Sequence, residues 1–581
     1  MMAVPTTSFH LKNEKASTHL FLPLLENEES SSDGGSGGGQ ELTNSSPNDI
    51  IVQGKEAPIE PPPRVKVRVF PRLIKFVLAI LVSGLFLLGL PLAIVMYLIV
   101  GSVPRLFVRL LLSCSNGGRY KLMPISRGFG STYGNHHTVM LIVRGRCDIE
   151  KIRKHMTKVL NSIDPTTGNK KFTHLQKRVE KKFGYLCHEE RYPTFDMKNH
   201  VKHFDILRKN IVVSMDEIIP FLETTYEEPF ENAHSAPQWE VLVIPKFAYS
   251  DEEAKLLGAS DRKQFYALVF RFHHGIMDWN MFQELLVEFL GKTSGRIRSI
   301  FSPPMKYSLW TTLKTYLAMP FVGPVSFLRQ VCLKWKTFGD LNITTPRISL
   351  STTKTIDIDT FEDVKERTFT SISSVLVNCL RVSARNLVLG QNLEVPKDLR
   401  VTRVFNTMTC ELQGVDSFRI NFSKYRIALE RLQATFHAIE REYGVCFLAA
   451  QRLFNKMIMV MAGGLPYELN TWLYRNMLKG DFILEFWPCA DEPCTVFGDD
   501  LVADMMGWSG IASVDAEMKV TVTTYCGRVR ANFMGRQGFF GSLTDAQILS
   551  FEFQEEVKKL AAISGIYQSR LFLPPAVDNG I

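Results

Sequence analysis

Two adjacent histidines and an aspartate close behind them form the segment of this chain best suited to acid–base chemistry. They are His273, His274 and Asp278, in the segment His273-His274-Gly275-Ile276-Met277-Asp278. An imidazole titrates near neutral pH, so a positioned histidine can take a proton from a hydroxyl and return it to a leaving group. Acyl transfer from a thioester to an alcohol is chemistry of this kind, and it needs neither a metal nor a covalent enzyme intermediate.

The surrounding sequence places this segment between a strand and a helix. Phe265 to Phe272 is typical of a strand, and apolar residues recur behind the motif at helical spacing: Phe282, Leu285, Leu286, Phe289 and Leu290. A side chain at such a junction can project into a cleft, although Asp278 could simply be the N-cap of the helix. A second pair, His136-His137, has Leu141 at the position of the acid and is interpreted as structural.

The chain beyond its N-terminal region alternates between strand and helix patterns, which indicates an α/β fold. The expected elements of the first unit are strands at Thr138–Arg144, Val201–Ile206, Trp239–Ile244 and Phe265–Phe272 and a helix at Asp148–Leu160. A second α/β unit from about 350 to 570 is expected to hold a long helix near Ser423–Arg441 and a late strand near Met518–Tyr525. The stretch Ala318–Leu328, with Pro320 and Pro324, either lies in a membrane interface or packs between the units.

An uncharged run of 25 residues, Phe76 to Val100, predicts a membrane segment, because it is long enough to cross roughly 30 Å of hydrocarbon. Basic residues bracket the run: Arg64, Lys66, Arg68, Arg72 and Lys75 before it, and Arg105, Arg109, Arg119 and Lys121 after it. Gly84, Gly89 and Pro91 lie within it, so both a spanning helix and a re-entrant hairpin fit. A hairpin would keep both ends in the cytosol.

Composition narrows the classes of function. The net charge of +9 and the pI of about 8.9 come with basic residues beside the apolar run, which favours membrane lipids over nucleic acid as the partner. The ten cysteines are scattered without a CxxC pair, which argues against a zinc site or a disulfide framework. Residues 1–63, which include the Ser/Gly run Ser30–Gly39, are predicted to be a disordered tail without a signal peptide.

Four segments in order resemble the wax ester synthase/diacylglycerol acyltransferase family, which belongs to the chloramphenicol-acetyltransferase-like superfamily with the HHxxxDG signature. Besides the histidine motif, Phe195-Asp196-Met197-Lys198-Asn199-His200-Val201 matches the family's FDxxxHV segment. Pro237-Gln238-Trp239-Glu240 matches its PLWE segment with Gln238 in place of Leu, and Thr524-Tyr525-Cys526-Gly527 resembles its SYxG strand. The resemblance covers about residues 120 to 565.

The resemblance implies two chloramphenicol-acetyltransferase-like domains that form a pseudo-dimer around a tunnel. Its boundaries would be a tail at 1–63, a membrane anchor at 64–118, an N-terminal half at 119–290, a connection at 291–345 and a C-terminal half at 346–570. His274 carries over as the general base. His273 and Asp278 carry over as supports of the loop, with Asp278 in an internal salt bridge. Trp279 and Trp239 are candidates for substrate binding.

The expected reaction is acyl transfer from acyl-CoA, as co-substrate and without a cofactor, to a long-chain alcohol or diacylglycerol. The expected location is the endoplasmic reticulum with the catalytic halves facing the cytosol, or a lipid droplet; the oligomeric state stays open. The chain departs from the family in having Trp279 for the motif glycine, Ser373-Ser374 for Asn-Asp and Pro488-Cys489-Ala490 for a PGP-like turn. A non-catalytic lipid-binding or lipid-transfer protein with the same tunnel is therefore the alternative, and an acyltransferase for soluble acceptors is a third.

Overall fold

The computed structural model describes isolated positions between residues 77 and 92 and then most of the chain up to residue 565. The described ranges are 95–115, 119–125, 136–190, 195–204, 212–227, 230, 236–249, 264–291, 309–332, 347–392, 394–405, 414–421, 427–442, 444–478, 480–510, 516–536 and 545–565. The predicted tail at 1–63 lies outside the described residues, as does much of the run Phe76–Val100. The sheets and helices below belong to one compact unit, Val82–Ile581.

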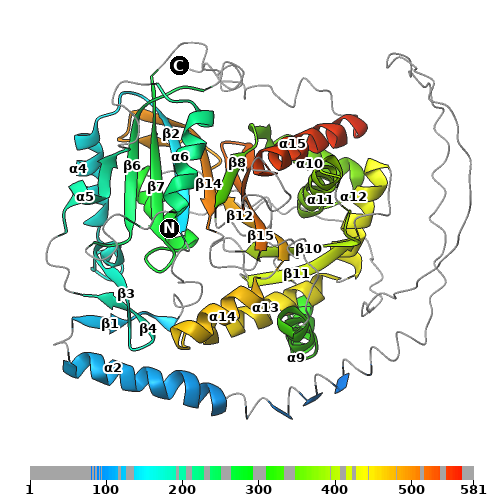
Figure 1. Cartoon of the computed structure of the whole chain (residues 1–581), viewed down its shortest axis with the longest axis horizontal. Helices are drawn as coiled ribbons and strands as arrows, with labels where there is room; N and C mark the ends of the chain where they lie inside the picture. The colour runs from blue at the N-terminus through cyan, green and yellow to red at the C-terminus, as the bar shows by residue number, and fades with distance from the viewer. Residues whose placement is uncertain are drawn as a thin grey trace, which may run out of the picture. The chain divides into compact units, whose positions relative to one another are not determined.

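The first large sheet has six strands in the order β13-β14-β2-β7-β6-β5. Its strands are β13 (Thr495–Val496), β14 (Asp500–Ser509), β2 (His136–Arg144), β7 (Phe265–His273), β6 (Trp239–Phe247) and β5 (Val201–His203). All neighbours are antiparallel except β5 and β6. Two of the strands, β13 and β14, come from late in the chain, and the orange β14 lies among the cyan and green strands of the first half (Figure 1).

The second large sheet has seven strands. Its main order is β11-β10-β12-β15-β16-β8, and β9 pairs with β16. The bounds are β8 (Ile348–Thr352), β9 (Ile356–Asp357), β10 (Asp398–Phe405), β11 (Gly414–Asn421), β12 (Gly480–Pro488), β15 (Ala516–Tyr525) and β16 (Arg528–Arg536). A third, smaller sheet has the order β1-β4-β3, with β1 (Tyr120–Leu122), β4 (Tyr185–Glu189) and β3 (Arg178–Lys182).

Three apolar cores bury the faces of the two large sheets. Alternate residues of β2 enter different cores, as the two-residue period of a strand requires: Val139 and Leu141 enter one and Met140 and Ile142 another. The first core includes residues of α4 (Ile149–Leu160) and α8 (Trp279–Phe289), and the second those of α6 (Met215–Glu227) and both sheets. The third lies between the second sheet and α10 (Ile358–Thr368), α11 (Ile372–Gly390) and α15 (Asp545–Ile563).

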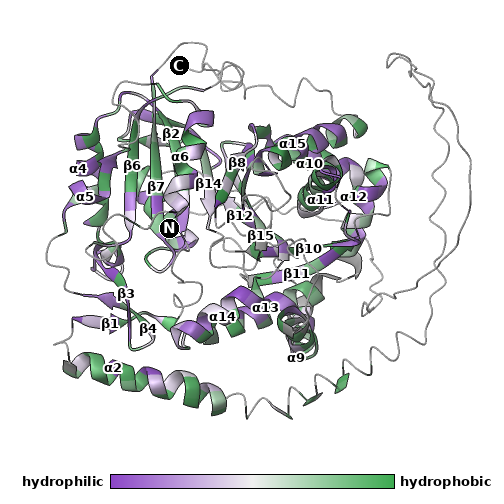
Figure 2. Ribbon diagram, viewed as in Figure 1, coloured by the Kyte–Doolittle hydropathy of each residue, from purple (hydrophilic) through white to green (hydrophobic). Residues whose placement is uncertain are grey.

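The remaining helices of the described part of the chain follow here in chain order. They are η1 (Leu98–Ser102), α2 (Val103–Ser115), η2 (Thr173–Gln176), α5 (Met197–His200), α9 (Leu309–Cys332), α12 (Ala428–Phe436), η4 (His437–Glu442), α13 (Gly444–Ala462) and α14 (Tyr467–Met477). Apolar residues run along α2 and α9 (Figure 2). The connection expected at 291–345 thus contains a 24-residue helix with Pro320 and Pro324 inside it.

Two helices among the described residues are long and apolar enough to cross a membrane, judged by length and composition alone. One is Val95–Cys114, in which 17% of the most apolar 18-residue window is buried. The other is α11, of which 83% is buried, so it is a core helix of the second half. Membrane insertion of the N-terminal region therefore remains a prediction.

Several predicted elements are confirmed. The apolar runs at 138–144, 239–244 and 265–272 form β2, β6 and β7, and Asp148 is the N-cap of α4, where it accepts hydrogen bonds from Glu150 N and Lys151 N. The predicted late strand forms β15, and the long helix near 423–441 corresponds to α12 and η4. The strand expected at 201–206 is shorter than predicted, because β5 ends at His203.

Candidate active site

The histidine motif occupies the turn between β7 and α8. β7 ends at His273, and His273 O accepts hydrogen bonds from Ile276 N at 2.9 Å and Met277 N at 3.1 Å, which closes the turn. β7 is buried along its whole length between β2 and β6. The motif therefore extends from the centre of a packed sheet, as its sequence predicts.

His273 supports this turn from inside. Its side chain is buried, and its Nδ1 accepts the Gly275 N–H at 3.0 Å. A Cβ at Gly275 would approach His273 Nδ1 and Met123 to 3.1 Å, closer than side chains usually pack. These contacts fit the predicted role of His273 as a support of the loop.

Asp278 is the N-cap of α8. Its carboxylate accepts the Met281 N–H at 2.9 Å, and its backbone carbonyl accepts the Phe282 N–H. Within the described part of the chain this carboxylate forms no ion pair, so the expected internal salt bridge is not found there. The capping role weighed from the sequence is the one that the structure shows.

His274 lies against a residue that the sequence analysis had set aside. His137 Nε2 and His274 Nδ1 are 2.9 Å apart, and His137 Nδ1 and Ser509 Oγ are 3.0 Å apart. His137 comes from β2, Ser509 from β14 and His274 from the turn after β7, so two strands and this turn contribute to a chain of side-chain hydrogen bonds. The interpretation of His136-His137 as purely structural therefore missed that His137 belongs to the site.

The four clustered histidines differ in burial. His136, His137 and His273 are buried, whereas His274 is partly exposed. Burial lowers the pKa of His137 well below its ordinary value, and the neighbouring His274, Lys519, His136 and His273 lower it further. Burial, with Arg271 and His273 nearby, also lowers the pKa of His136. His136 and His137 are therefore neutral near pH 7.

Trp279, which replaces the motif glycine, is buried at the start of α8. Its ring stacks on Trp487 of β12, with centroids 4.2 Å apart and an interplanar angle of 11°. The rings of Trp487 and His137 lie edge-to-face, with centroids 5.8 Å apart. The Trp279–Trp487 pair thus joins α8 to the second sheet beside the histidines, and a substrate-binding role for Trp279 stays a prediction.

Trp239 lies at the start of β6, away from this pair. It is buried and stacks on His200 at 4.4 Å, and its Nε1 donates to Leu175 O at 2.7 Å. With His200 and Glu240 it lines a small hollow. A role of Trp239 in substrate binding also stays a prediction.

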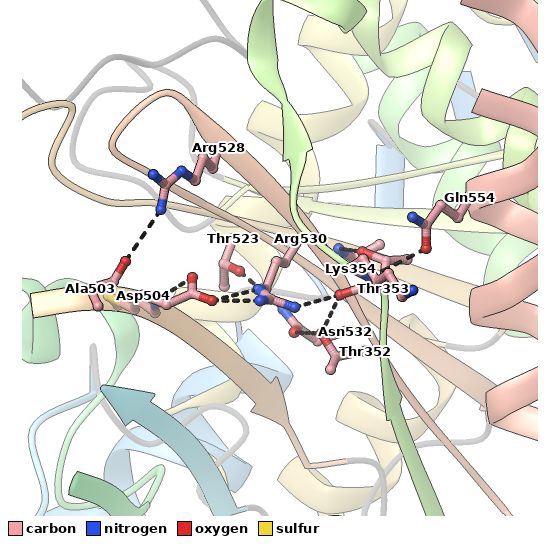
Figure 3. A network of polar contacts seen from close by, with 12 residues as sticks. Thr352, Thr353, Lys354, Ala503, Asp504, Thr523, Arg528, Arg530, Asn532 and Gln554 are labelled. Carbon is pink, nitrogen blue, oxygen red and sulfur yellow. Dashed lines mark hydrogen bonds and ion pairs between the residues drawn. The ribbon is translucent and has the colours of Figure 1, made fainter. Parts of the chain in front are cut away.

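A buried ion pair links the two sheets close to β14. Arg530 of β16 donates from Nε to Asp504 Oδ2 of β14 at 2.9 Å, and Arg530 Nη1 donates to Thr353 O at 2.6 Å (Figure 3). A second buried pair joins Lys519 of β15 to Glu485 of β12 at 2.8 Å. Lys519 also donates to Gly510 O, next to Ser509, at 3.3 Å. The strand that carries Ser509 is therefore fixed from both sheets.

No protein-family model matches the chain, and neither does any curated protein. The chain is similar in structure to the wax ester synthase/diacylglycerol acyltransferase from Marinobacter aquaeolei VT8, at 13% identity and a TM-score of 0.48, over 76% of this chain and 99% of that one. It is also similar to TRI3 trichothecene 15-O-acetyltransferase from Fusarium sporotrichioides, at 9% identity, TM-score 0.46 and coverages of 78% and 96%. A third similar structure is the starter condensation domain of rhizomide synthetase RzmA, at 10% identity, TM-score 0.43 and coverages of 80% and 98%.

The family whose signature the sequence resembles is thus represented among the similar structures. At such low identities the function has to be argued from the residues of the site itself.

Among the described residues, no group of three or more His, Cys, Asp or Glu side chains could hold a metal ion. The site instead offers the partly exposed imidazole of His274. It is hydrogen-bonded to the buried neutral imidazole of His137, which is hydrogen-bonded in turn to the buried hydroxyl of Ser509. Such an arrangement can accept and return a proton.

Proposed function

We propose that this chain is an O-acyltransferase that moves a fatty acyl group from acyl-CoA to a lipid hydroxyl, with His274 as the general base. The observation that carries the proposal is the difference in burial within the histidine cluster. Of the four clustered histidines, only His274 is partly exposed. It lies where the sequence resemblance places the base, at the end of a rigid strand.

The proposed reaction balances with His274 as its only proton carrier. The imidazole takes the proton of the acceptor hydroxyl while the oxygen attacks the thioester carbonyl. The tetrahedral intermediate then breaks its C–S bond, and the imidazolium returns the proton to the departing thiolate. The products are the ester and free CoA, and His274 is neutral again.

The apolar helix near the N-terminus supports a lipid acceptor, because long-chain alcohols and diacylglycerols reside in the bilayer. Large apolar residues on the Val95–Cys114 helix are exposed, including Val95, Met96, Leu106, Phe107 and Leu110. We propose that this region anchors the protein to the endoplasmic reticulum or to a lipid droplet, with the catalytic halves in the cytosol. Protease protection of sealed microsomes from expressing cells tests this orientation: exposed catalytic halves would be digested from the outside.

The enzymatic test uses membranes from a host that lacks its own neutral-lipid acyltransferases. Labelled acyl-CoA is supplied with a long-chain alcohol or with diacylglycerol, and His274→Ala is compared with the wild type. We expect labelled ester from the wild type and a loss of about 10²- to 10⁴-fold in the variant, the usual contribution of a general base. His203→Ala is the matched control, because His203 is a partly buried histidine of the same sheet outside the site.

Equal activity of His274→Ala and the wild type would refute the assignment of the base. Binding or transfer of lipid without any ester, unchanged in His274→Ala, would instead support the alternative of a non-catalytic lipid-binding protein. Competition between lipid and soluble acceptors separates the proposed reaction from acyl transfer to a soluble alcohol or amine.

A further inference from the structure

We propose that His137 and Ser509 are positioning residues that hold His274 in the one neutral tautomer able to act as a base. This inference rests on the proposed function of His274. Its structural basis is the register of three neighbouring strands. His137 of β2 lies opposite Phe272 of β7, next to the motif, and opposite Ser509 of β14.

This register fixes the positions of His137 and Ser509, and His274 follows the last residue of β7. The side chains of His137 and Ser509 are both buried. β2, which carries His137, pairs along its length with β7 on one side and with β14, which carries Ser509, on the other. The two hydrogen bonds, 2.9 Å and 3.0 Å long, run through both ring nitrogens of His137. Because a neutral His137 has one N–H and one lone pair, the direction of its hydrogen bond with Ser509 and the direction of its hydrogen bond with His274 are coupled.

The direction of the hydrogen bonds follows from the chemistry required. A neutral imidazole has one N–H and one lone pair, so a base acting through Nε2 must carry its hydrogen on Nδ1. His274 Nδ1–H then donates to His137 Nε2, and His137 Nδ1–H donates to the Ser509 hydroxyl. In the opposite tautomer, His274 Nε2 would carry the hydrogen and could not accept a proton from the substrate.

This arrangement works only while His137 is neutral, because a protonated His137 would donate to His274 Nδ1. The groups that face His137 disfavour its protonation. Lys519 from β15, His136 from its own strand, and His273 and His274 from β7 and the turn all act in this direction. Glu485, the partner of Lys519, is held at 2.8 Å from that ammonium.

His137 also continues to act after proton transfer. Once His274 is an imidazolium, its Nδ1–H still donates to the lone pair on His137 Nε2, so the charged intermediate keeps its partner. No carboxylate is required for this role, which agrees with the use of Asp278 as a helix cap.

The test measures kcat, KM and the pH profile of acyl transfer in three variants. His137→Phe preserves a ring but removes the acceptor, and we expect kcat to fall about 10²- to 10⁴-fold with little change in KM, as expected for a base in the wrong tautomer. His137→Gln retains an acceptor and should recover at least tenfold over His137→Phe. Ser509→Ala should cost less than His137→Phe, because it removes only the outer hydrogen bond.

A second measurement does not depend on activity. Diethylpyrocarbonate modifies neutral imidazole nitrogens, and mass spectrometry of the full-length protein can follow the pH dependence of modification at His274. We expect His137→Phe, and more weakly Ser509→Ala, to change the rate and the pH midpoint of this modification. Unchanged modification and unchanged kcat in both variants would overturn the inference. If His274→Ala is inactive in the same assays, the proposed function would survive that result.

A separate observation concerns α9, which has one buried and one exposed face. Gly323 brings α9 against α13 so closely that a Cβ there would overlap the Phe454 ring, and Gln330 donates to Ser417 Oγ at 3.0 Å. The opposite face exposes large apolar residues at helical spacing: Leu309, Trp310, Leu313, Tyr316, Leu317, Phe321 and Leu328. We call these seven residues the α9 stripe.

We infer that the α9 stripe inserts into the interface of a lipid bilayer that contains anionic headgroups. The charged residues of α9 are Lys314 and Arg329, both basic, and α2 likewise carries only Arg105 and Arg109. Lys314 lies 5.2 Å from the Trp310 ring centroid, an arrangement that places an ammonium beside an interfacial aromatic group. Basic and aromatic residues beside an apolar stripe suit a membrane surface better than a protein partner.

The α9 stripe is also connected to the apolar helix Val95–Cys114. α9 contacts both α13 and α14, and the turn between these two helices contacts the apolar helix, with Gly464 against Tyr97 and Leu465 against Gly101. Further along α14, Trp472 is exposed. One supporting body therefore carries both apolar surfaces.

The test uses full-length protein in vesicles of brominated phosphatidylcholine, which quenches indoles that reach the acyl chains. The fluorescence difference between the wild type and Trp310→Phe isolates the signal of Trp310. We expect this signal to be more than halved in brominated vesicles relative to unbrominated ones, and to be quenched more strongly when phosphatidylserine is included. Trp508→Phe is the matched control, because Trp508 is fully buried and its difference signal should be unquenched. An unquenched Trp310 signal in integrated protein would overturn the inference and favour a protein partner or a second copy.

Discussion

Replacing Trp279 by glycine separates two explanations of this residue. If the Trp279–Trp487 pair joins the halves of the molecule, Trp279→Gly should destabilise the protein strongly. Only 2% of the Trp279 side chain and 1% of Trp487 is exposed. Loss of a buried tryptophan costs about 3–5 kcal/mol, and glycine in the first helical turn adds up to about 1 kcal/mol. We therefore expect a loss of about 3–6 kcal/mol in the free energy of unfolding.

The assay is thermal unfolding of the purified full-length protein. Because the entropy of unfolding grows with chain length, the unit Val82–Ile581 should lose roughly 1 °C of Tm per kcal/mol, so the expected loss lowers Tm by about 3–6 °C. Phe551→Ala is the matched control, because it removes an aromatic ring that is exposed on α15 and should shift Tm by less than about 2 °C. A ring that merely narrowed an acceptor channel would give the opposite result. In that case Trp279→Gly would leave Tm near that of the wild type and raise activity on bulky acceptors, which would refute the structural role.

Three further predictions concern single interactions. Asp278→Ala should lower the free energy of unfolding by about 1 kcal/mol, as loss of an N-cap does, and keep the rate of acyl transfer within about tenfold of the wild type. A loss of a thousandfold or more in that rate would show that Asp278 acts in the chemistry. Arg530→Met should cost about 3–5 kcal/mol in thermal unfolding, since Asp504 would be left buried without its partner, whereas Lys558→Met at a surface pair should cost under about 1 kcal/mol. Because burial keeps His136 and His137 neutral, the unfolded chain binds more protons below about pH 6.5 and stability should fall by up to about 1.4 kcal/mol per pH unit for each. The drop in Tm between pH 7.5 and pH 5.5 should therefore be smaller in His137→Gln than in the wild type. Equal drops in the two proteins would contradict this account.

Local patterns in the sequence predict the strands that carry the motif. The runs that form β2, β6 and β7 are continuous apolar segments, because each strand is buried on both faces. The turn between β7 and α8 is equally local, since His273, Gly275 and Asp278 stabilise it through bonds within a few residues. Such features can be recognised in a single sequence.

The other half of the site depends on pairing between distant strands. Ser509 lies 372 residues after His137, and β14 joins β2 although the intervening chain forms most of the second half. No period or spacing records such a register. The signal available in the sequence was the position of His136-His137 at the start of a buried apolar strand, where two polar rings need partners. Such a need for partners speaks against a merely structural role for the pair, but it does not point to Ser509.

The late arrival of β14 imposes an order on folding during synthesis. β2 and β7 can pair early, but the other edge of β2 has no partner until Asp500–Ser509 has been made. At translation rates of 5–20 residues per second, the 372 residues that separate His137 from Ser509 take roughly 20 to 75 seconds. During that time an apolar strand edge next to the histidines is open to other chains, so the nascent first half is a natural client for chaperones. The chain of hydrogen bonds from His274 through His137 to Ser509 can therefore be completed only after β14 has been synthesised.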